Sequence, residues 1–271
     1  MAASFTGFAQ VGIGTTSPDV TAELDVTSTT KGFLPPRMTK VQMETISPTE
    51  GLIIYCTNCI PNGIYTGNGT AYISMRAETV NVPAGVTLAA GEVYTATGRI
   101  WMDKNLEATQ VATSLIDVDS YGGFYQWGKK DNVRSSPELV GPVASNTGNF
   151  VTVAAGDWLS TPDDTRWNGA TKGTEDPCPV GYRVPTSSEW SAEIETWISK
   201  NDAGAFASPL KLPSTGRRNT SGSLGEAGTV GYYWSSTPNG TLANHLRFLS
   251  NNAYINFSVR AYGFAVRCIK E

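Results

Sequence analysis

Residues 252–260 alternate strictly between apolar and polar side chains. Successive side chains of a strand point to opposite faces, so the alternation predicts a strand with one buried and one open face. The apolar set, expected to point inward, is Ala253, Ile255, Phe257 and Val259. The other set offers amide, phenol, hydroxyl and guanidinium groups, with no Asp or Glu between Glu226 and Glu271. Tyr and Asn suit ligand contact because they combine area with adaptable hydrogen bonding; an ordinary solvated sheet face is the alternative.

The composition narrows the class of protein. The chain has 271 residues and a net charge of −4, so it lacks the basic excess that a general nucleic-acid or anionic-membrane binder needs to neutralise phosphates. Only 16% of its residues are charged, and glycine is abundant, as in secreted β-rich proteins. No apolar run reaches the length of a membrane span.

The first ten residues, MAASFTGFAQ, lack the basic start and long apolar stretch of a complete signal peptide. They look like the end of such a signal, so we expect a start that is truncated or engineered. An ordinary disordered N-terminus is the alternative. The expected location is extracellular or on the cell surface, with the tip of a phage-like tail as the other possibility.

The four cysteines favour disulfides, because an even count is typical of exported chains. Cys56 and Cys59 form a CxxC pair, for which neither a second pair of zinc ligands nor the helix start of a redox motif is available. A local disulfide in a hairpin loop is therefore expected. Cys178 and Cys268 both lie in the C-terminal half, and we expect them to pair.

The chain divides into three parts, and its predicted class is α+β and β-rich. Residues 1–75 are expected to form a small β-rich attachment or oligomerisation module, since all seven Trp lie at or after Trp101. Residues 76–97 read as a linker or connecting strands, and residues 98–271 as the larger domain. Within the module, residues 51–75 read as strand, turn, strand.

The clearest helix signal lies over residues 187–199. Thr186 and Glu189 have the spacing of a capping box. The apolar residues that then fall on one buried face are Trp190, Ile194, Trp197 and Ile198. Residues 201–208 should end the helix, residues 214–231 should form a long loop, and a strand should restart at Tyr232.

The larger domain resembles a known family through five segments in order: GRIWMDKNL (98–106), SYGGFYQWG (120–128), CPVGYRVPTSSEW (178–190), YYWSST (232–237) and YGFAVRCI (262–269). The family is the Fibrobacter succinogenes major paralogous domain, found in surface proteins of Bacteroidota. The resemblance covers about residues 95–271. It implies a C-type-lectin-like fold, in which Cys178 and Cys268 occupy structural positions.

Two further resemblances concern the ends of the chain. The segments VGIGTTSP, LDVTSTTKGFLPPRMT and GLIIYCT are similar to those at the base of surface proteins and tail-fibre-like proteins, which implies an assembly module and favours a homotrimer. Residues 239–262 resemble the variable region of proteins diversified by retroelements, where Asn-type codons mutate. The alternative is a fixed family member with an Asn-rich sheet face.

Catalysis has little support in the sequence, and no enzyme activity, cofactor or metal is expected. His245 is the only histidine, and no GxSxG motif or phosphate-binding loop occurs. Asp117 and Asp119 have the spacing of part of a calcium loop, but its terminal Glu is lacking. Trp158 and Trp167, each near an Asp, could stack on a sugar ring, although a solvated loop is favoured.

The function expected from the sequence is that of a secreted or surface-displayed adhesin or receptor-binding protein. The alternative is a structural component of a fibre, pilus or phage-like tail. A host-cell surface protein or glycan is the expected partner, not a nucleic acid. The predicted ligand-binding residues are Trp234, Asn244, His245, Arg247, Asn251, Asn252, Tyr254, Asn256, Arg260 and Tyr262.

Overall fold

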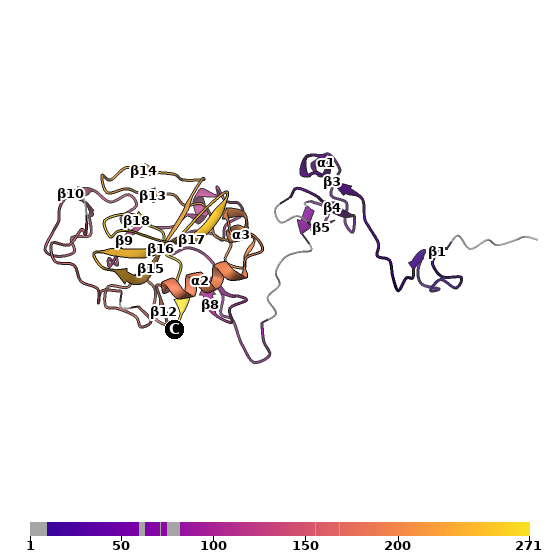
Figure 1. Ribbon diagram of the computed structural model, residues 1–271, viewed down its shortest axis with the longest axis horizontal. Helices are drawn as coiled ribbons and strands as arrows, with labels where there is room; N and C mark the ends of the chain where they lie inside the picture. The colour runs from indigo at the N-terminus through magenta and orange to yellow at the C-terminus, as the bar shows by residue number, and fades with distance from the viewer. Residues whose placement is uncertain (1–9, 60–62, 71, 75–81, 155, 168) are drawn as a thin grey trace, which may run out of the picture. The chain divides into compact units, whose positions relative to one another are not determined.

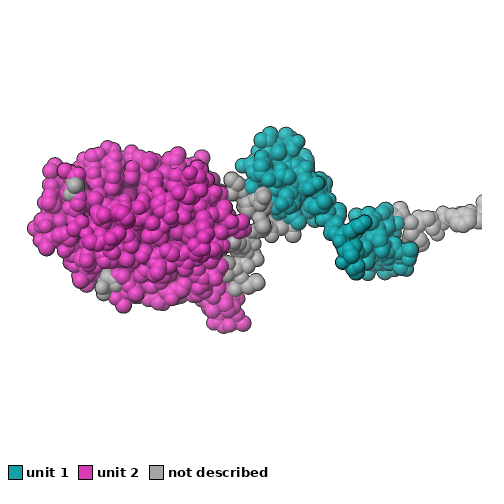
Figure 2. All heavy atoms as spheres, viewed as in Figure 1, with its two compact units in different colours: residues 1–76 teal, residues 77–271 magenta. Residues whose placement is uncertain are grey.

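The computed structural model describes residues 10–59, 63–70, 72–74, 82–154, 156–167 and 169–271. The chain forms two compact units, Met1–Arg76 and Ala77–Glu271, hereafter the N-terminal and C-terminal units (Figure 2). Most of the signal-like segment, residues 1–9, lies outside the described residues. Among the described residues of both units, strands far outnumber helices, which confirms the predicted β-rich α+β class.

The N-terminal unit contains a two-stranded sheet, β1-β2, and a four-stranded sheet, β3-β4-β5-β6. Its elements are β1 (Val11–Ile13), β2 (Leu24–Val26), β3 (Arg37–Met38), α1 (Lys40–Glu44), β4 (Ile53–Cys56), β5 (Gly63–Gly67) and β6 (Tyr72–Ser74). The second predicted strand is split into β5 and β6 after Gly67, where Gly69 has a φ of 89°. The predicted disulfide between Cys56 and Cys59 is present at the end of β4.

Within the described residues, the C-terminal unit holds four sheets, with orders β12-β19-β8-β7, β14-β13-β18-β9, β15-β16-β17 and β10-β11. Figure 1 labels most of their strands. Its strands are β7 (Glu92–Tyr94), β8 (Ile100–Met102), β9 (Tyr125–Gln126), β10 (Glu138–Val140), β11 (Phe150–Thr152), β12 (Tyr182–Arg183), β13 (Arg217–Arg218), β14 (Leu224–Gly225), β15 (Gly231–Asn239), β16 (Leu242–Leu249), β17 (Asn252–Val259), β18 (Gly263–Phe264) and β19 (Ile269–Lys270). Strand β7 lies inside the segment predicted as a linker or connecting strands.

The two ends of the C-terminal unit meet in one sheet. Strand β19, at the end of the chain, pairs with β8 through Ile269 and Trp101. The predicted disulfide between Cys178 and Cys268 is present and buried, and it ties the segment before β12 to the residue preceding β19. The unit is therefore closed by both backbone pairing and a covalent link.

The helices of the C-terminal unit are η1 (Val118–Ser120), α2 (Ser187–Thr196) and α3 (Asp202–Ala207). The capping box of α2 is confirmed, with Thr186 and Glu189 bonding to each other's backbone N–H groups. The helix ends at Thr196, earlier than predicted, so Ile198 is 50% exposed and its predicted burial is wrong. Helix α3 was missed; its N-cap is Asn201, whose side-chain oxygen accepts from the N–H of Gly204 at 3.1 Å.

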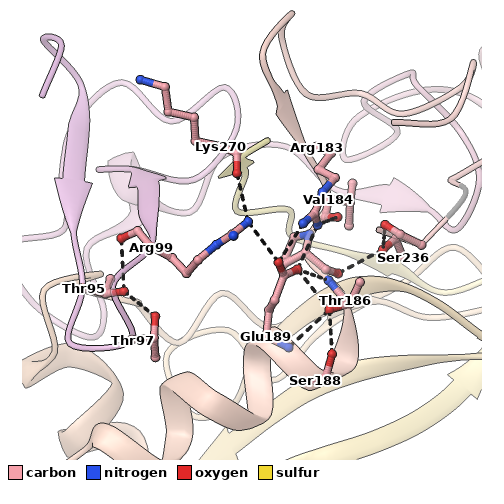
Figure 3. A network of polar contacts seen from close by, with 12 residues as sticks. Thr95, Thr97, Arg99, Arg183, Val184, Thr186, Ser188, Glu189, Ser236 and Lys270 are labelled. Carbon is pink, nitrogen blue, oxygen red and sulfur yellow. Dashed lines mark hydrogen bonds and ion pairs between the residues drawn. The ribbon is translucent and has the colours of Figure 1, made fainter. Parts of the chain in front are cut away.

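Glu189 also links separate parts of the unit (Figure 3). Its carboxylate accepts from both Nη atoms of Arg183 at 2.8 and 2.7 Å and from Nη2 of Arg99 at 3.3 Å. Arg99 also donates to the carbonyl oxygen of Lys270 at 3.3 Å. Although burial works against ionisation, the hydrogen bonds and charge of Arg183 hold the pKa of Glu189 below its ordinary value. The start of α2 is thus fixed to β12 and to the chain end.

One face of the β15-β16-β17 sheet covers the main core, which includes Trp101, Trp190, Tyr233, Leu246 and Phe248. Ala253 and Ile255 of β17 pack against this cluster as predicted, and α2 contacts all three strands from this side.

Phe257 is the exception, with 55% exposure, so its predicted burial is wrong. It pairs across the sheet with Asn244, beyond the pair of Leu246 and Ile255, which still packs in or against the main core. The cluster below the sheet does not extend to this position, and alternation alone cannot show where a core ends.

Candidate functional site

The opposite face of the β15-β16-β17 sheet carries most of the predicted ligand-binding side chains. Two rows cross it in register. Tyr232, Arg247 and Tyr254 form one row, and Trp234, His245 and Asn256 form the next. The sequence alternation therefore assigned Tyr254 and Asn256 to the correct face.

Trp234 and His245 are fully buried, so the expectation that they face a ligand is wrong. The cause is Phe264 of β18, whose ring lies 4.3 Å from that of Trp234 and 4.8 Å from that of His245. Trp234 is held further by its indole N–H, which donates to the carbonyl oxygen of Tyr125 at 2.7 Å. Near β15 the sheet is covered on both faces, and only its β17 side is open.

Burial of His245 makes the C-terminal unit sensitive to acid. Burial, aided by the positive charge of Arg247, lowers the pKa of His245 from 6.5 to about 3. A base whose pKa falls on folding contributes stability that is present above its unfolded pKa and is lost as the pH drops toward its folded pKa. We expect the unfolding free energy to fall by about 2 kcal/mol from pH 7 to pH 5 through this group alone. Urea unfolding at both pH values measures it.

The control for this prediction is His245→Leu, which cannot titrate. Its loss of stability between pH 7 and pH 5 should be smaller than that of the unchanged protein by the same amount. Equal losses in the two proteins would show that His245 is not the acid-sensitive group.

Arg260 is also buried, and its predicted place on the ligand face is wrong. It follows the last residue of β17, and its side chain turns inward over the ring of Trp127, 4.3 Å from the ring centroid. The guanidinium donates to the carbonyl oxygens of Leu242 at 3.1 Å and Gly240 at 2.8 Å. It also forms ion pairs with Asp157, at 3.4 Å, and Asp164. These contacts make Arg260 a structural residue.

Beside these covered residues lie two arginines and three tyrosines, which we call the Arg–Tyr face: Arg217, Tyr232, Arg247, Tyr254 and Tyr262. The ring of Tyr232 is itself buried under the two guanidinium groups, and the other four side chains are partly exposed. The guanidinium carbon of Arg217 lies 5.2 Å from the ring centroid of Tyr232 and 5.1 Å from that of Tyr262. That of Arg247 lies 5.7 Å from the centroid of Tyr232 and 5.9 Å from that of Tyr254. Nη1 of Arg247 donates to the hydroxyl of Tyr254 at 2.6 Å.

Glu226 borders the Arg–Tyr face and neutralises one of its arginines. Its Oε2 lies 3.0 Å from Nε of Arg217 and accepts from the hydroxyl of Tyr232 at 2.8 Å. Burial, together with this bond, raises the pKa of Tyr232 to about 12. Burial of Arg247 works to lower its pKa, but the phenols of Tyr232 and Tyr254 raise it overall, so Arg247 stays charged.

Sequence reasoning missed three members of this site. Tyr232 could have been predicted, because it lies two residues before Trp234 in the same strand and its side chain therefore points to the same face. Arg217 and Glu226 come from the segment predicted as a long loop, which instead forms the small β13-β14 hairpin. No local pattern links that segment to the sheet face.

The asparagines of the prediction occupy three kinds of position. Asn251 is exposed in the turn between β16 and β17, and Asn252 is exposed as the first residue of β17. Asn256 is half-buried on the same face as Tyr254. Asn244 is half-buried but lies on the other face, opposite Phe257, where it accepts from the amide of Asn239 at 3.2 Å. The structure thus leaves Asn251, Asn252 and Asn256 beside the Arg–Tyr face and places Asn244 elsewhere.

The other positions considered for chemistry are engaged within the fold. Asp117 accepts hydrogen bonds from Gln110 and Thr113, which lower its pKa despite some loss of solvation. Trp158 and Trp167 are fully buried, so neither can stack on a sugar ring. In the part of the chain that the structure describes, no group of three or more His, Cys, Asp or Glu is placed to hold a metal ion.

Comparison with protein-family models gives a match for the N-terminal part of the chain. Residues 12–88 match a family model described as a phage tail like trimerisation region, which fits the segment with the predicted tail-fibre resemblance. The match covers less than half of the chain. Comparisons with curated proteins and with solved structures give no match. Among the helices of the described residues, none has the length and apolar character needed to span a membrane.

Proposed function

We propose that this protein is a trimeric receptor-binding protein of a fibre or phage-like tail, or a related secreted adhesin. Residues 12–88 hold three copies together, and the C-terminal unit binds a host-cell surface protein or glycan through the Arg–Tyr face. The activity is recognition and not catalysis.

The observation that carries the proposal is the Arg–Tyr face itself. Tyr and Arg are the residue types that dominate binding energies at protein interfaces. Here Tyr254 and Tyr262 offer partly exposed rings, and Arg247 is held in place by the hydroxyl of Tyr254. No carboxylate of β15, β16 or β17 competes for Arg247. This arrangement suits a ligand with a planar or sugar ring beside an acidic or hydroxyl group.

The framework below the face supports this role. The disulfide of Cys178 and Cys268, the aromatic core and the Glu189 network fix the fold independently of the face. Asn251, Asn252, Tyr254 and Asn256 lie outside the buried clusters, so substitutions there leave the core intact. That separation is what a retroelement-diversified binding protein with a lectin-like domain requires, and we include this in the proposal.

Trimer formation supports binding through several weak contacts at once. A chain that presents one face per copy gains avidity when three copies engage the same surface. At the tip of a fibre or tail that touches a host cell, three copies of the face can reach the same surface. The proposed location is therefore extracellular, on a cell surface or at the tip of a phage-like tail.

The proposal predicts that Arg247→Ala and Tyr254→Ala each weaken binding by about 30-fold, or roughly 2 kcal/mol. Binding is measured as fluorescence of labelled protein on intact cells from a panel of candidate hosts. The unfolding free energy should change by only about 0.5 kcal/mol, because both side chains are partly exposed. Tyr254→Phe, which removes only the acceptor for Arg247, should give an intermediate loss.

Arg99→Ala is the matched control, since Arg99 is a partly exposed arginine in the Glu189 network, on the side of the sheet that α2 covers. It should bind as the unchanged protein does. Binding that survives both face variants refutes the assignment of this face. A trimer that binds no cell of the panel favours the alternative of a structural fibre component, which the trimerisation match supports equally.

A further inference from the structure

The β1-β2 ribbon of the N-terminal unit has its apolar side open. The two strands are parallel and in register, with Val11 opposite Leu24, Gly12 opposite Asp25, and Ile13 opposite Val26. Because alternate residues share a face, one side of the ribbon is entirely aliphatic and the other carries only Gly12 and Asp25. The exposures on the aliphatic side are 52% for Val11, 55% for Ile13, 52% for Leu24 and 43% for Val26.

The chain covers the polar side of this ribbon with its own loop. A β-carbon at Gly12 would lie 2.8 Å from the carbonyl oxygen of Thr15 and 2.9 Å from Cγ of Pro18. The carboxylate of Asp25 accepts from the backbone N–H of Asp19 at 2.9 Å. The loop between the strands is thus packed on the polar face, which could remain in contact with water. Within the described residues, nothing covers the aliphatic face.

We propose that this aliphatic face, made of Val11, Ile13, Leu24 and Val26, is the surface through which three copies of the chain associate; the inference rests on the proposed trimeric state. An isolated two-stranded sheet is only marginally stable in water. Two strands of three residues each therefore need a partner that covers their apolar face. Around a three-fold axis, each copy brings the same four aliphatic side chains to the centre.

The occupant is a second and third copy because three of the four face residues, Ile13, Leu24 and Val26, lie within the matched trimerisation region, which begins at Gly12. The face carries no charge or hydrogen-bonding side chain that would select a polar partner. A competing surface exists on the other sheet of the unit, where Ile53 and Ile64 are partly exposed. That four-stranded sheet has its own core of Met43, Ile54, Cys56, Cys59 and Tyr65, and therefore does not depend on a partner.

The test measures the mass of the full chain in solution by light scattering at micromolar concentration. The unchanged protein should be a trimer and the double variant Ile13→Lys/Val26→Lys a monomer, because three lysine pairs cannot be buried at one axis. Val20→Lys is the matched control, since Val20 is 89% exposed in the loop and off the ribbon face. It should remain trimeric. Unfolding of the C-terminal unit should be the same in all three proteins.

Cross-linking gives a second measurement that does not depend on a disruptive change. All four native cysteines are in disulfides, so Ile13→Cys adds a single free thiol. It should form an inter-chain disulfide on mild oxidation, and Val20→Cys should not.

The outcomes separate the inference from the proposed function. A monomeric unchanged protein refutes the trimer and with it this interface. If Ile13→Lys/Val26→Lys remains a trimer, the inference is overturned and the proposed function stands. Loss of the trimer in Ile64→Lys would then place the interface on the four-stranded sheet. Equal cross-linking of Ile13→Cys and Val20→Cys also counts against it.

Discussion

The variant Arg260→Met is expected to lose about 3–5 kcal/mol of unfolding free energy, because it removes one partner of a buried ion pair. The side chains of Arg260 and Asp157 are 1% and 4% exposed. The change would leave Asp157 buried without its cation and would strip hydrogen bonds from the carbonyl oxygens of Leu242 and Gly240. Methionine keeps contact with Trp127 in place of the guanidinium. The loss of unfolding free energy therefore measures mainly the missing ion pair and hydrogen bonds.

The dependence on pH identifies the cause of this loss. Burial already raises the pKa of Asp157 above its ordinary value, although Arg260 opposes the rise. Without Arg260 that pKa should rise further. A carboxyl whose pKa is raised on folding contributes stability that is present below its unfolded pKa and is lost as the pH rises through its folded pKa. The penalty of Arg260→Met should therefore be larger at pH 7 than at pH 4.

Urea unfolding of four proteins measures these effects. Adding Asp157→Asn to Arg260→Met should recover part of the stability at pH 7, because the unpaired charge is gone. Arg247→Met is the matched control and should change stability by about 0.5 kcal/mol, since Arg247 is partly exposed. Equal effects of Arg260→Met and Arg247→Met would mean that Arg260 lies at the surface after all.

The contrast between these two arginines shows what strand periodicity can and cannot predict. Alternation fixes which face a side chain takes, and it placed Arg247, Tyr254 and Asn256 correctly. It holds only while the strand continues, and β17 ends at Val259. Arg260 lies one residue beyond, where the backbone turns, so the alternation no longer applies to it.

Burial on the predicted open face could not be read from the sequence for a different reason. Trp234 and His245 are covered by Phe264, and Trp234 donates to Tyr125. These contacts join residues that are far apart along the chain, through the pairing of β18 with β9. A pattern within one strand contains no information about a second layer that another strand lays over it.

Features that depend only on residues close together in the sequence were predicted most reliably. The capping box of α2 depends only on the spacing of Thr186 and Glu189, and it is present. The end of the same helix depends on how Trp197 packs into the core, and its predicted position was wrong. The hairpin that supplies Arg217 was likewise missed because its pairing with β18 is long-range.

Loss of the disulfide between Cys178 and Cys268 is the second large effect that we expect. The bond closes a loop with a sequence separation of 90 residues, and loop entropy gives a stabilisation on the order of 4–5 kcal/mol. The double variant Cys178→Ser/Cys268→Ser should lose about that much, and more if the buried hydroxyls find no partner. Thermal or urea unfolding of the C-terminal unit measures the loss.

The N-terminal disulfide provides the matched control in the same chain. Cys56 and Cys59 are only three residues apart, so the same relation gives roughly 1–2 kcal/mol for their bond. Cys56→Ser/Cys59→Ser should leave the unfolding of the C-terminal unit unchanged, because that bond lies in the other unit. Both sulfurs of the long-range bond are buried, so we expect a mild reductant to leave it intact until denaturant is added. Two results would contradict this prediction. One is peptide mapping without reduction that finds free thiols at Cys178 and Cys268. The other is a C-terminal unit of Cys178→Ser/Cys268→Ser that unfolds at the same urea concentration as the unchanged protein.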